Sequence, residues 1–276
     1  MRTLTWPLLL SLFLALSGCW SMPHHSGAKQ AGSIVDYLYP DAKEAPAMQA
    51  TVTRLQPPVR VGIAFAPSAN YASLPEATKQ KLLERVKSSF SQYEFIGDIQ
   101  IIPSQYLRPR GGFDNLDQVA RLFNVEVVAL VSYDQVQFKD ASALSVLYWT
   151  VVGAYVIRGD KYDVQTLVDA AVFDVKSRKL LFRAPGTSQI KGSATMVGFS
   201  EHSRAAQAAG YDQAIAQMIP QLQAELSSFR ERIKSDAGFK VVNKEGYKGG
   251  GSLGWPGAML GLILAMGVYA GRRGKR

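Results

Sequence analysis

The sequence is poor in the residues that build metal and redox sites: among 276 residues it has one cysteine, Cys19, and three histidines. A single cysteine excludes an intramolecular disulfide, a CxxC redox pair and a cysteine-based zinc site. His24 and His25 are adjacent, so they point to different sides of the chain, and the nearest carboxylate is Asp36. We therefore expect a polar linker there rather than a metal site, which leaves His202 as the only histidine of the folded region.

Motifs for catalysis and for cofactors are also absent. The chain has no GxSxG, no HExxH and no dinucleotide fingerprint. The segment Gly186–Gly198 contains glycines but lacks the lysine-serine order of a P-loop, and we expect a flexible loop there. As an alternative, this loop binds a partner through Met196, Val197 and Phe199. Together these absences predict no cofactor, no metal site and a protein that is not an enzyme.

Acidic residues are missing from both chain ends, which changes how the formal net charge of +9 is interpreted. Basic residues at the two ends supply more than half of that charge, namely Arg2, Arg272, Arg273, Lys275 and Arg276. The small remainder is an ordinary solvated surface, and no basic run with interleaved aromatic residues occurs. We therefore expect no nucleic-acid partner.

The N-terminus has the order of a secretory signal. Arg2 supplies a positive region, and Leu8–Leu16 supplies an apolar run too short for a comfortable bilayer span. The sequence Leu16-Ser17-Gly18-Cys19 then resembles the lipobox that the bacterial lipoprotein signal peptidase recognises. The resemblance implies that residues 1–18 are removed and that Cys19 receives lipid, which anchors the chain at about 0.8 kcal/mol per buried methylene.

The C-terminus contains a second membrane signal in three parts. Residues 236–252 form a linker that ends in four small residues, residues 253–271 are apolar, and residues 272–276 are basic. Nineteen residues at 1.5 Å each reach about 28 Å, enough for the hydrocarbon core, and the basic tail should stay cytoplasmic. The small residues then lie on the outer side; they are Gly249, Gly250, Gly251 and Ser252.

This three-part order resembles the GlyGly-CTERM sorting signal, whose family partner is rhombosortase, a rhomboid-type intramembrane protease of Gram-negative bacteria. Together with the lipobox, it resembles the rhombotarget lipoproteins. The resemblance implies cleavage in the glycine region and transfer from the inner membrane, facing the periplasm, to the outer membrane or cell surface. A plain C-terminal anchor with a glycine linker is the alternative, although Pro256, Gly257 and Gly261 weaken the helix where such a protease must unwind it.

Between the two signals, we expect a flexible tether over residues 19–58 and one domain over residues 59–235. Strands and amphipathic helices alternate in the first half of that domain, which predicts βαβ units and a mostly parallel core. A capping box of Ser73 and Glu76 should begin the first helix, and Asp114 should cap the second. The expected strands of this half are Val59–Ala66, Ile99–Ile102 and Val125–Val131.

The second half of the domain predicts an antiparallel meander followed by a helix. We expect strands over Leu144–Ile157, Asp163–Val175 and Lys179–Ile190, and then a helix over Glu201–Ile233 that Pro220 kinks or divides. Asp169 is the odd residue within a strand, and we expect it to face solvent or an edge. Asp160 and Asp163 are expected to flank a turn, where they are solvated.

The predicted fold class is therefore α/β, a single mixed-sheet domain whose element order resembles curli-secretion lipoproteins and penicillin-binding-protein activator lipoproteins. Two functions stay open. The first is a non-catalytic envelope lipoprotein that binds another envelope protein or copies of itself. The second is a periplasmic hydrolase with a non-local active site around His202, for which we expect a deep pocket that brings this histidine together with an acid and a hydroxyl.

Overall fold

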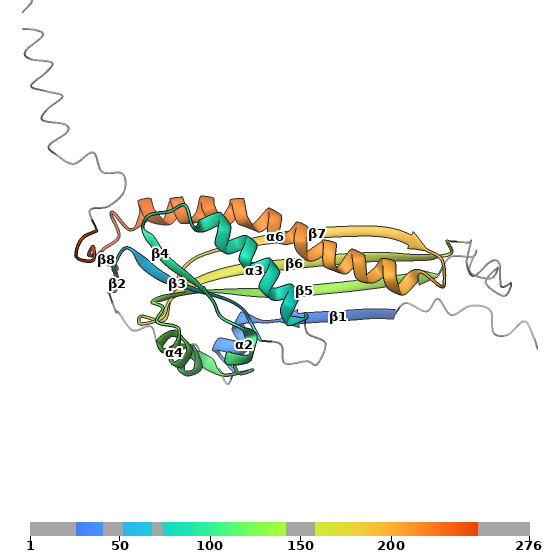
Figure 1. Cartoon of the computed structure of the whole chain (residues 1–276), viewed down its shortest axis with the longest axis horizontal. Helices are drawn as coiled ribbons and strands as arrows, with labels where there is room; N and C mark the ends of the chain where they lie inside the picture. The colour runs from blue at the N-terminus through green and yellow to red at the C-terminus, as the bar shows by residue number, and fades with distance from the viewer. Residues whose placement is uncertain (1–25, 41–51, 68–73, 142–157, 248–276) are drawn as a thin grey trace, which may run out of the picture.

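The computed structural model describes residues 26–40, 52–67, 74–141 and 158–247 (Figure 1). Cys19, the two N-terminal histidines, Ser73, the expected strand Leu144–Ile157 and the whole C-terminal signal from Gly249 onward lie outside these residues. Within the described ranges, none of the helices combines the length and the apolar character that crossing a membrane requires.

A six-stranded mixed sheet forms the centre of the fold and confirms the predicted α/β class. β3 pairs in parallel with β4 on one side and with β5 on the other, while β5, β6 and β7 are antiparallel neighbours. The parallel βαβ core and the antiparallel meander therefore share one sheet. The strands on this path are β4 (Ile96–Ile101), β3 (Val59–Phe65), β5 (Val127–Ala141), β6 (Asp160–Asp174) and β7 (Lys179–Ala194).

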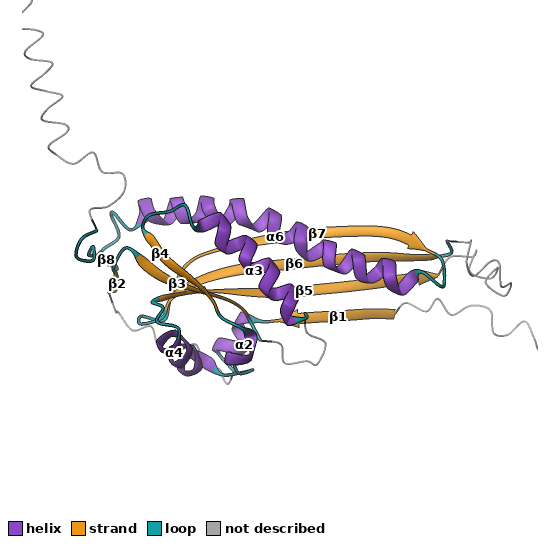
Figure 2. Cartoon of the chain, in the orientation of Figure 1, coloured by secondary structure: helices purple, strands orange, loops and turns teal. Residues whose placement is uncertain are grey.

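Helices cover the two faces of the sheet unequally (Figure 2). One face carries α3 (Glu76–Phe90) and the long helix α6 (Phe199–Arg232), and the other carries α2 (Ile34–Leu38) and α4 (Gly112–Leu122). A short 3-10 helix, Ser104–Tyr106, follows β4. Each face has its own hydrophobic core, and the α3–α6 core is the larger of the two.

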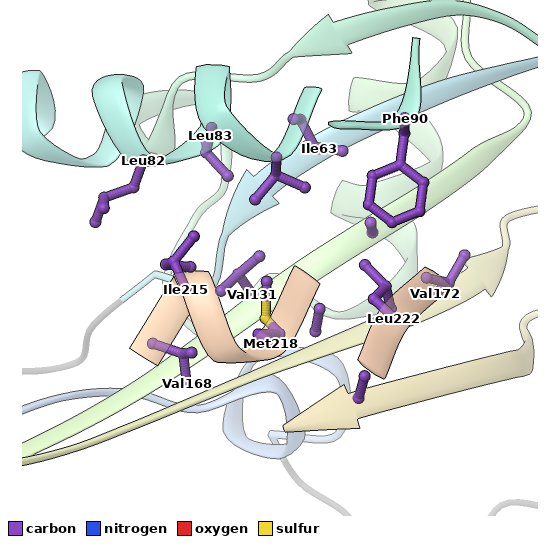
Figure 3. Close-up of a cluster of buried hydrophobic side chains, with 14 of the residues drawn as sticks. Ile63, Leu82, Leu83, Phe90, Val131, Val168, Val172, Ile215, Met218 and Leu222 are labelled. Atoms are coloured by element: carbon purple, nitrogen blue, oxygen red, sulfur yellow. The ribbon is translucent and has the colours of Figure 1, made fainter. Parts of the chain in front are cut away.

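Apolar residues at helical spacing determine how α3 and α6 pack. On α3, Leu82, Leu83, Val86 and Phe90 lie on one face at helical spacing and are buried, as is typical of an amphipathic helix. Figure 3 shows Leu82, Leu83 and Phe90 of α3 opposite Ile215, Met218 and Leu222 of α6, with Val131, Val168 and Val172 of the sheet beside them. Burying one such side chain contributes about 1.5–3 kcal/mol.

The strands β5, β6 and β7 extend well beyond the parallel core. They have 15, 15 and 16 residues, whereas β3 pairs only with Val127–Val131 at the start of β5. Beyond that point β1 (Ser26–Gly32) pairs antiparallel with Tyr133–Lys139 and continues the line of β3 along the same edge of β5. We call this outer half of the sheet, built from β1 and the outer parts of β5, β6 and β7, the distal sheet.

The predicted boundaries of the domain are too narrow, because folded elements lie in the expected tether and linker. Residues 19–58 contain β1, α2 and β2 (Thr53–Leu55), and residues 236–252 contain β8 (Phe239–Val241), which pairs in parallel with β2. These elements are three to seven residues long, too short to show a hydrophobic period. Tyr37 of α2 is nonetheless 1% exposed and donates a hydrogen bond to Asn115 Oδ1 at 3.1 Å, and burial raises the pKa of its hydroxyl.

Several predicted local features are also corrected. Most of the expected loop Gly186–Gly198 is strand, because β7 continues to Ala194. Asp160 and Asp163 lie within β6 rather than beside a turn. Pro220 lies inside α6 without dividing it, since one lost hydrogen bond is offset by the packing of the buried residues on either side.

Both helix starts differ from the expected capping pattern. Pro75 is the N-cap of α3 and makes no side-chain cap, while the Glu76 carboxylate accepts a hydrogen bond from the Ser104 amide at 2.8 Å. α4 begins at Gly112, whose φ of +66° lies in the left-handed region that favours glycine, and Asp114 therefore lies in the first turn of the helix rather than at its cap. Asp114 pairs there with Arg178 at 3.1 Å.

Candidate functional site

The lipidation and processing residues predicted from sequence lie outside the described residues, but the structure describes where the chain departs toward them. Ser26, seven residues after Cys19, begins β1 and pairs with Lys139 at the outer end of the distal sheet. Tyr247, two residues before Gly249, donates its amide hydrogen to the Lys244 carbonyl oxygen, and the Lys244 amide donates to Pro57, next to β2. β2 and β8 lie at the opposite end of the fold from the outer end of β1 (Figure 1). The two predicted signals are therefore connected to opposite ends of the fold.

His202 is not part of a catalytic arrangement within the described residues. It lies in the first turn of α6, it is exposed, and its ring makes no hydrogen bond to an acid or a hydroxyl of the described chain. Over the same residues, no three histidine, cysteine or acidic side chains come together to hold a metal ion. His202 does not line either of the two best-formed pockets of the described residues.

The acidic residues singled out from the β6 sequence are all paired across the sheet. Asp169 is partly exposed on the face away from α6 and contacts Arg183 at 3.3 Å, while Asp163 contacts Lys191 at 3.6 Å. Asp160 is 5% exposed and contacts Lys139 at 3.5 Å. Each of these three carboxylates therefore takes part in an ion pair that joins neighbouring strands.

An apolar hollow lies between the sheet and the ends of α3 and α6. It has a volume of about 530 Å³, within the range of about 300–1,000 Å³ that is usual for small-molecule sites. Strands β3 to β7 form its floor, and the two helices form its walls. The apolar lining includes Val61, Ile63, Val86, Phe90, Ile99, Ala129, Val172, Leu222, Leu226 and Phe229.

The charged side chains that line this pocket are all cationic: Lys87, Arg230 and Lys234. Lys234 is paired with Glu231 at 2.7 Å, and this hydrogen bond lowers the pKa of the Glu231 carboxyl. Arg230 places its guanidinium 4.4 Å from the centre of the Phe95 ring. No aspartate or glutamate lines the pocket among the described residues, so it offers cations above an apolar floor and no carboxylate base.

The apolar periodicity of the helices does not reveal the pocket between them. Val86 and Phe90 recur at helical spacing on α3, as Leu222, Leu226 and Phe229 do on α6. Their periodicity shows which side of each helix turns inward. It carries no information on how far apart the two helices stand, and that separation creates the space.

The distal sheet presents a second surface of interest. α6 covers one of its faces, where Gln135 donates hydrogen bonds to Thr166 Oγ1 at 2.7 Å and to the Gln207 carbonyl oxygen at 2.9 Å. No described helix covers the other face, on which Phe138 and Leu167 are 45% and 44% exposed. Val136 lies on the same face of β5 and is partly exposed.

Polar and charged side chains surround these apolar residues. Phe138 stands directly opposite Asp163, and Leu167 stands opposite Asp134, which pairs with Lys29 of β1 at 3.1 Å. An apolar centre with a charged border is typical of surfaces that contact other proteins. We call this surface, centred on Val136, Phe138 and Leu167, the open face.

Comparison with known proteins yields distant structural likenesses only. No known protein family and no curated protein sequence matches the chain. A PelC dodecamer structure from Paraburkholderia phytofirmans is 11% identical, with a TM-score of 0.29, over 70% of this chain and 96% of that one. A putative neuraminyllactose-binding hemagglutinin homolog from Helicobacter pylori is 10% identical, with a TM-score of 0.37, over 70% and 97%. A Xanthomonas campestris protein of family DUF330 is 10% identical, with a TM-score of 0.31, over 67% and 98%.

Proposed function

We propose that this chain is a bacterial envelope lipoprotein that acts without catalysis, by contact of its open face with another envelope protein or with a second copy of itself. The observation that carries this proposal is the exposure of Phe138 and Leu167 at the centre of a long, rigid sheet whose other face α6 covers. Apolar side chains on a preformed surface lose little conformational freedom on binding, which favours protein contact.

Membrane attachment and sorting complete the proposal. Cys19 carries lipid, and a rhomboid-type protease of the rhombosortase kind cuts the chain near Gly249 to Ser252, so that the lipidated domain leaves the inner membrane for the outer membrane or cell surface. The positions of the domain ends support this order of events. The glycines follow Tyr247 closely in the sequence, beyond β8 and its pairing with β2.

Site-directed photocrosslinking in living cells tests the contact. A photoreactive amino acid at position 138 or 167 should form a specific adduct, whereas the same residue at position 122 should not. Leu122 is a suitable control because it is 67% exposed but lies on α4, away from the distal sheet. An adduct at twice the chain mass identifies self-assembly, and any other discrete mass identifies a different partner. Equal labelling at all three positions, or none at 138 and 167, would refute the proposal.

Processing is tested by replacing Gly249, Gly250 and Gly251 with leucine. We expect the uncut chain to accumulate in the inner membrane, because a stable helix denies the protease an extended backbone. Membrane fractionation with intact-mass analysis provides the readout. Wild-type protein that still ends in Arg276 at its final location would rule out cleavage as the release step.

A further inference from the structure

The pocket between the sheet, α3 and α6 is too large to be a packing defect. Protein interiors are packed as densely as organic crystals, with few voids larger than one water molecule. A hollow of about 530 Å³ lined by side chains such as Val61, Ala129 and Leu226 forgoes dispersion contacts on every wall. A guest molecule of complementary chemistry would restore those contacts.

The volume of the pocket favours a single flexible chain over a peptide helix. If a methylene needs about as much room as a water molecule in the liquid, roughly 30 Å³, the pocket holds on the order of fifteen methylenes. An α-helix about 10–12 Å wide fills roughly 400–600 Å³ in each turn. The pocket therefore accommodates about one helical turn but the greater part of a long acyl chain.

The charged residues that line the pocket favour a ligand with a negatively charged head group. Lys87, on the last turn of α3, and Arg230, on the last turn of α6, both line the pocket, and no carboxylate of the described residues lies within ion-pair distance of either. The hydrogen bond from Lys234 at 2.7 Å and then the charge of Arg230 lower the pKa of the nearby Glu231 carboxyl. Two cations outside direct ion pairs, beside an apolar floor, are complementary to a carboxylate attached to a hydrocarbon chain.

We propose that this pocket binds one long-chain fatty acid, with its hydrocarbon chain between the sheet and the two helices and its carboxylate at Lys87 and Arg230. The proposal is independent of the open face, which lies on the other side of the sheet and nearer its outer end. It adds a small-molecule ligand to a chain whose proposed function is protein contact.

The full-length chain in its native membranes can be tested with a palmitate that carries a photoreactive diazirine near the end of its chain. After irradiation, the label should be found on peptides from α3 and from the last turns of α6, and not on the α4 peptide, which lies on the opposite face of the sheet. Unlabelled palmitate should compete at about tenfold lower concentration than hexadecanol, which has the same chain without the charge.

Matched substitutions separate the head-group contact from general charge effects. Lys87→Gln combined with Arg230→Gln should weaken labelling about tenfold. Lys81→Gln combined with Arg204→Gln should leave it unchanged, because these exposed residues lie on the same two helices but do not line the pocket. Val61→Phe, which removes room for about two methylenes, should also weaken labelling about tenfold, and Val197→Phe should not.

Three results would overturn the proposal. Equal competition by palmitate and hexadecanol would show that the cations do not recognise the carboxylate. Label on α4 as strongly as on α3 would show nonspecific partition. Absence of label, together with a concentration-dependent dimer that Val61→Phe weakens, would assign the pocket to a second copy of the chain. If Val61→Phe fails to fold, as circular dichroism would reveal, the charge variants and the hexadecanol comparison still decide.

Discussion

Removing the short N-terminal elements should unfold the domain, although the sequence pattern alone places them outside it. A fragment over residues 59–233 lacks α2, whose Ile34, Tyr37 and Leu38 are at most 9% exposed. Burial of three such side chains contributes about 5–8 kcal/mol. A domain of this size has a total stability of about 5–15 kcal/mol, so their loss alone removes much of the margin. The fragment also lacks the seven residue pairs between β1 and β5.

Thermal unfolding followed by circular dichroism provides the test. A fragment over residues 26–247 should unfold cooperatively, whereas the 59–233 fragment should aggregate or show no cooperative transition. A milder change works within the longer fragment: Tyr37→Ala should cost about 3–5 kcal/mol and lower the Tm by about 10 °C. Val35→Ala, on the same helix but 66% exposed, should change stability by less than about 0.5 kcal/mol. Equal Tm values for the two fragments would refute the reasoning.

Three further predictions follow from single contacts. Gly186→Val should destabilise the domain by about 3 kcal/mol, because a Cβ at this position would lie 2.1 Å from the Ala214 carbonyl oxygen of α6. Urea unfolding measures the change, and an unchanged midpoint would contradict the close packing of α6 on β7. Asp160→Asn should cost about 1–3 kcal/mol, since it removes a buried carboxylate that pairs with Lys139, and Tm values will show whether it does. Cys19→Ala should abolish lipid attachment, and a variant that keeps the wild-type mass and membrane partition even after deletion of the C-terminal signal would show that Cys19 is not lipidated.

Alternation and helical periodicity were sufficient to predict the elements that carry a continuous apolar face. Val164, Val168, Ala170 and Val172 alternate along β6, and all are buried toward α6. The chain turns before β7 in a short polar segment between two apolar runs, where Arg178 has a φ of +56°. Where one face of a helix or strand is buried, the spacing of its apolar residues shows which side faces the core.

Alternation and periodicity could not predict the elements that are held in place by backbone contacts. β1, whose sequence is SGAKQAG, has no apolar alternation and is defined by its ladder with β5. Gly186 and Gly192 made the outer part of β7 resemble a loop, yet a glycine is required at position 186 because α6 approaches β7 so closely. The pocket could not be predicted for a related reason. The distance between α3 and α6 depends on how both helices pack on the sheet, and no local sequence pattern records that distance.

The chain leaves the domain toward the two predicted membrane signals at opposite ends of the sheet, so the length of the sheet separates them. Val127 and Lys139 lie about 40 Å apart along β5 at about 3.3 Å per residue, which exceeds the roughly 30 Å hydrocarbon thickness of a bilayer. If Cys19 and the apolar segment 253–271 enter the same membrane, both ends of the domain are tethered to it, which favours an orientation with the long axis of the sheet along the membrane surface. The proposed cleavage near Gly249 to Ser252 would leave one tether, beside Ser26. The opposite end of the sheet could then move about 40 Å away from the membrane.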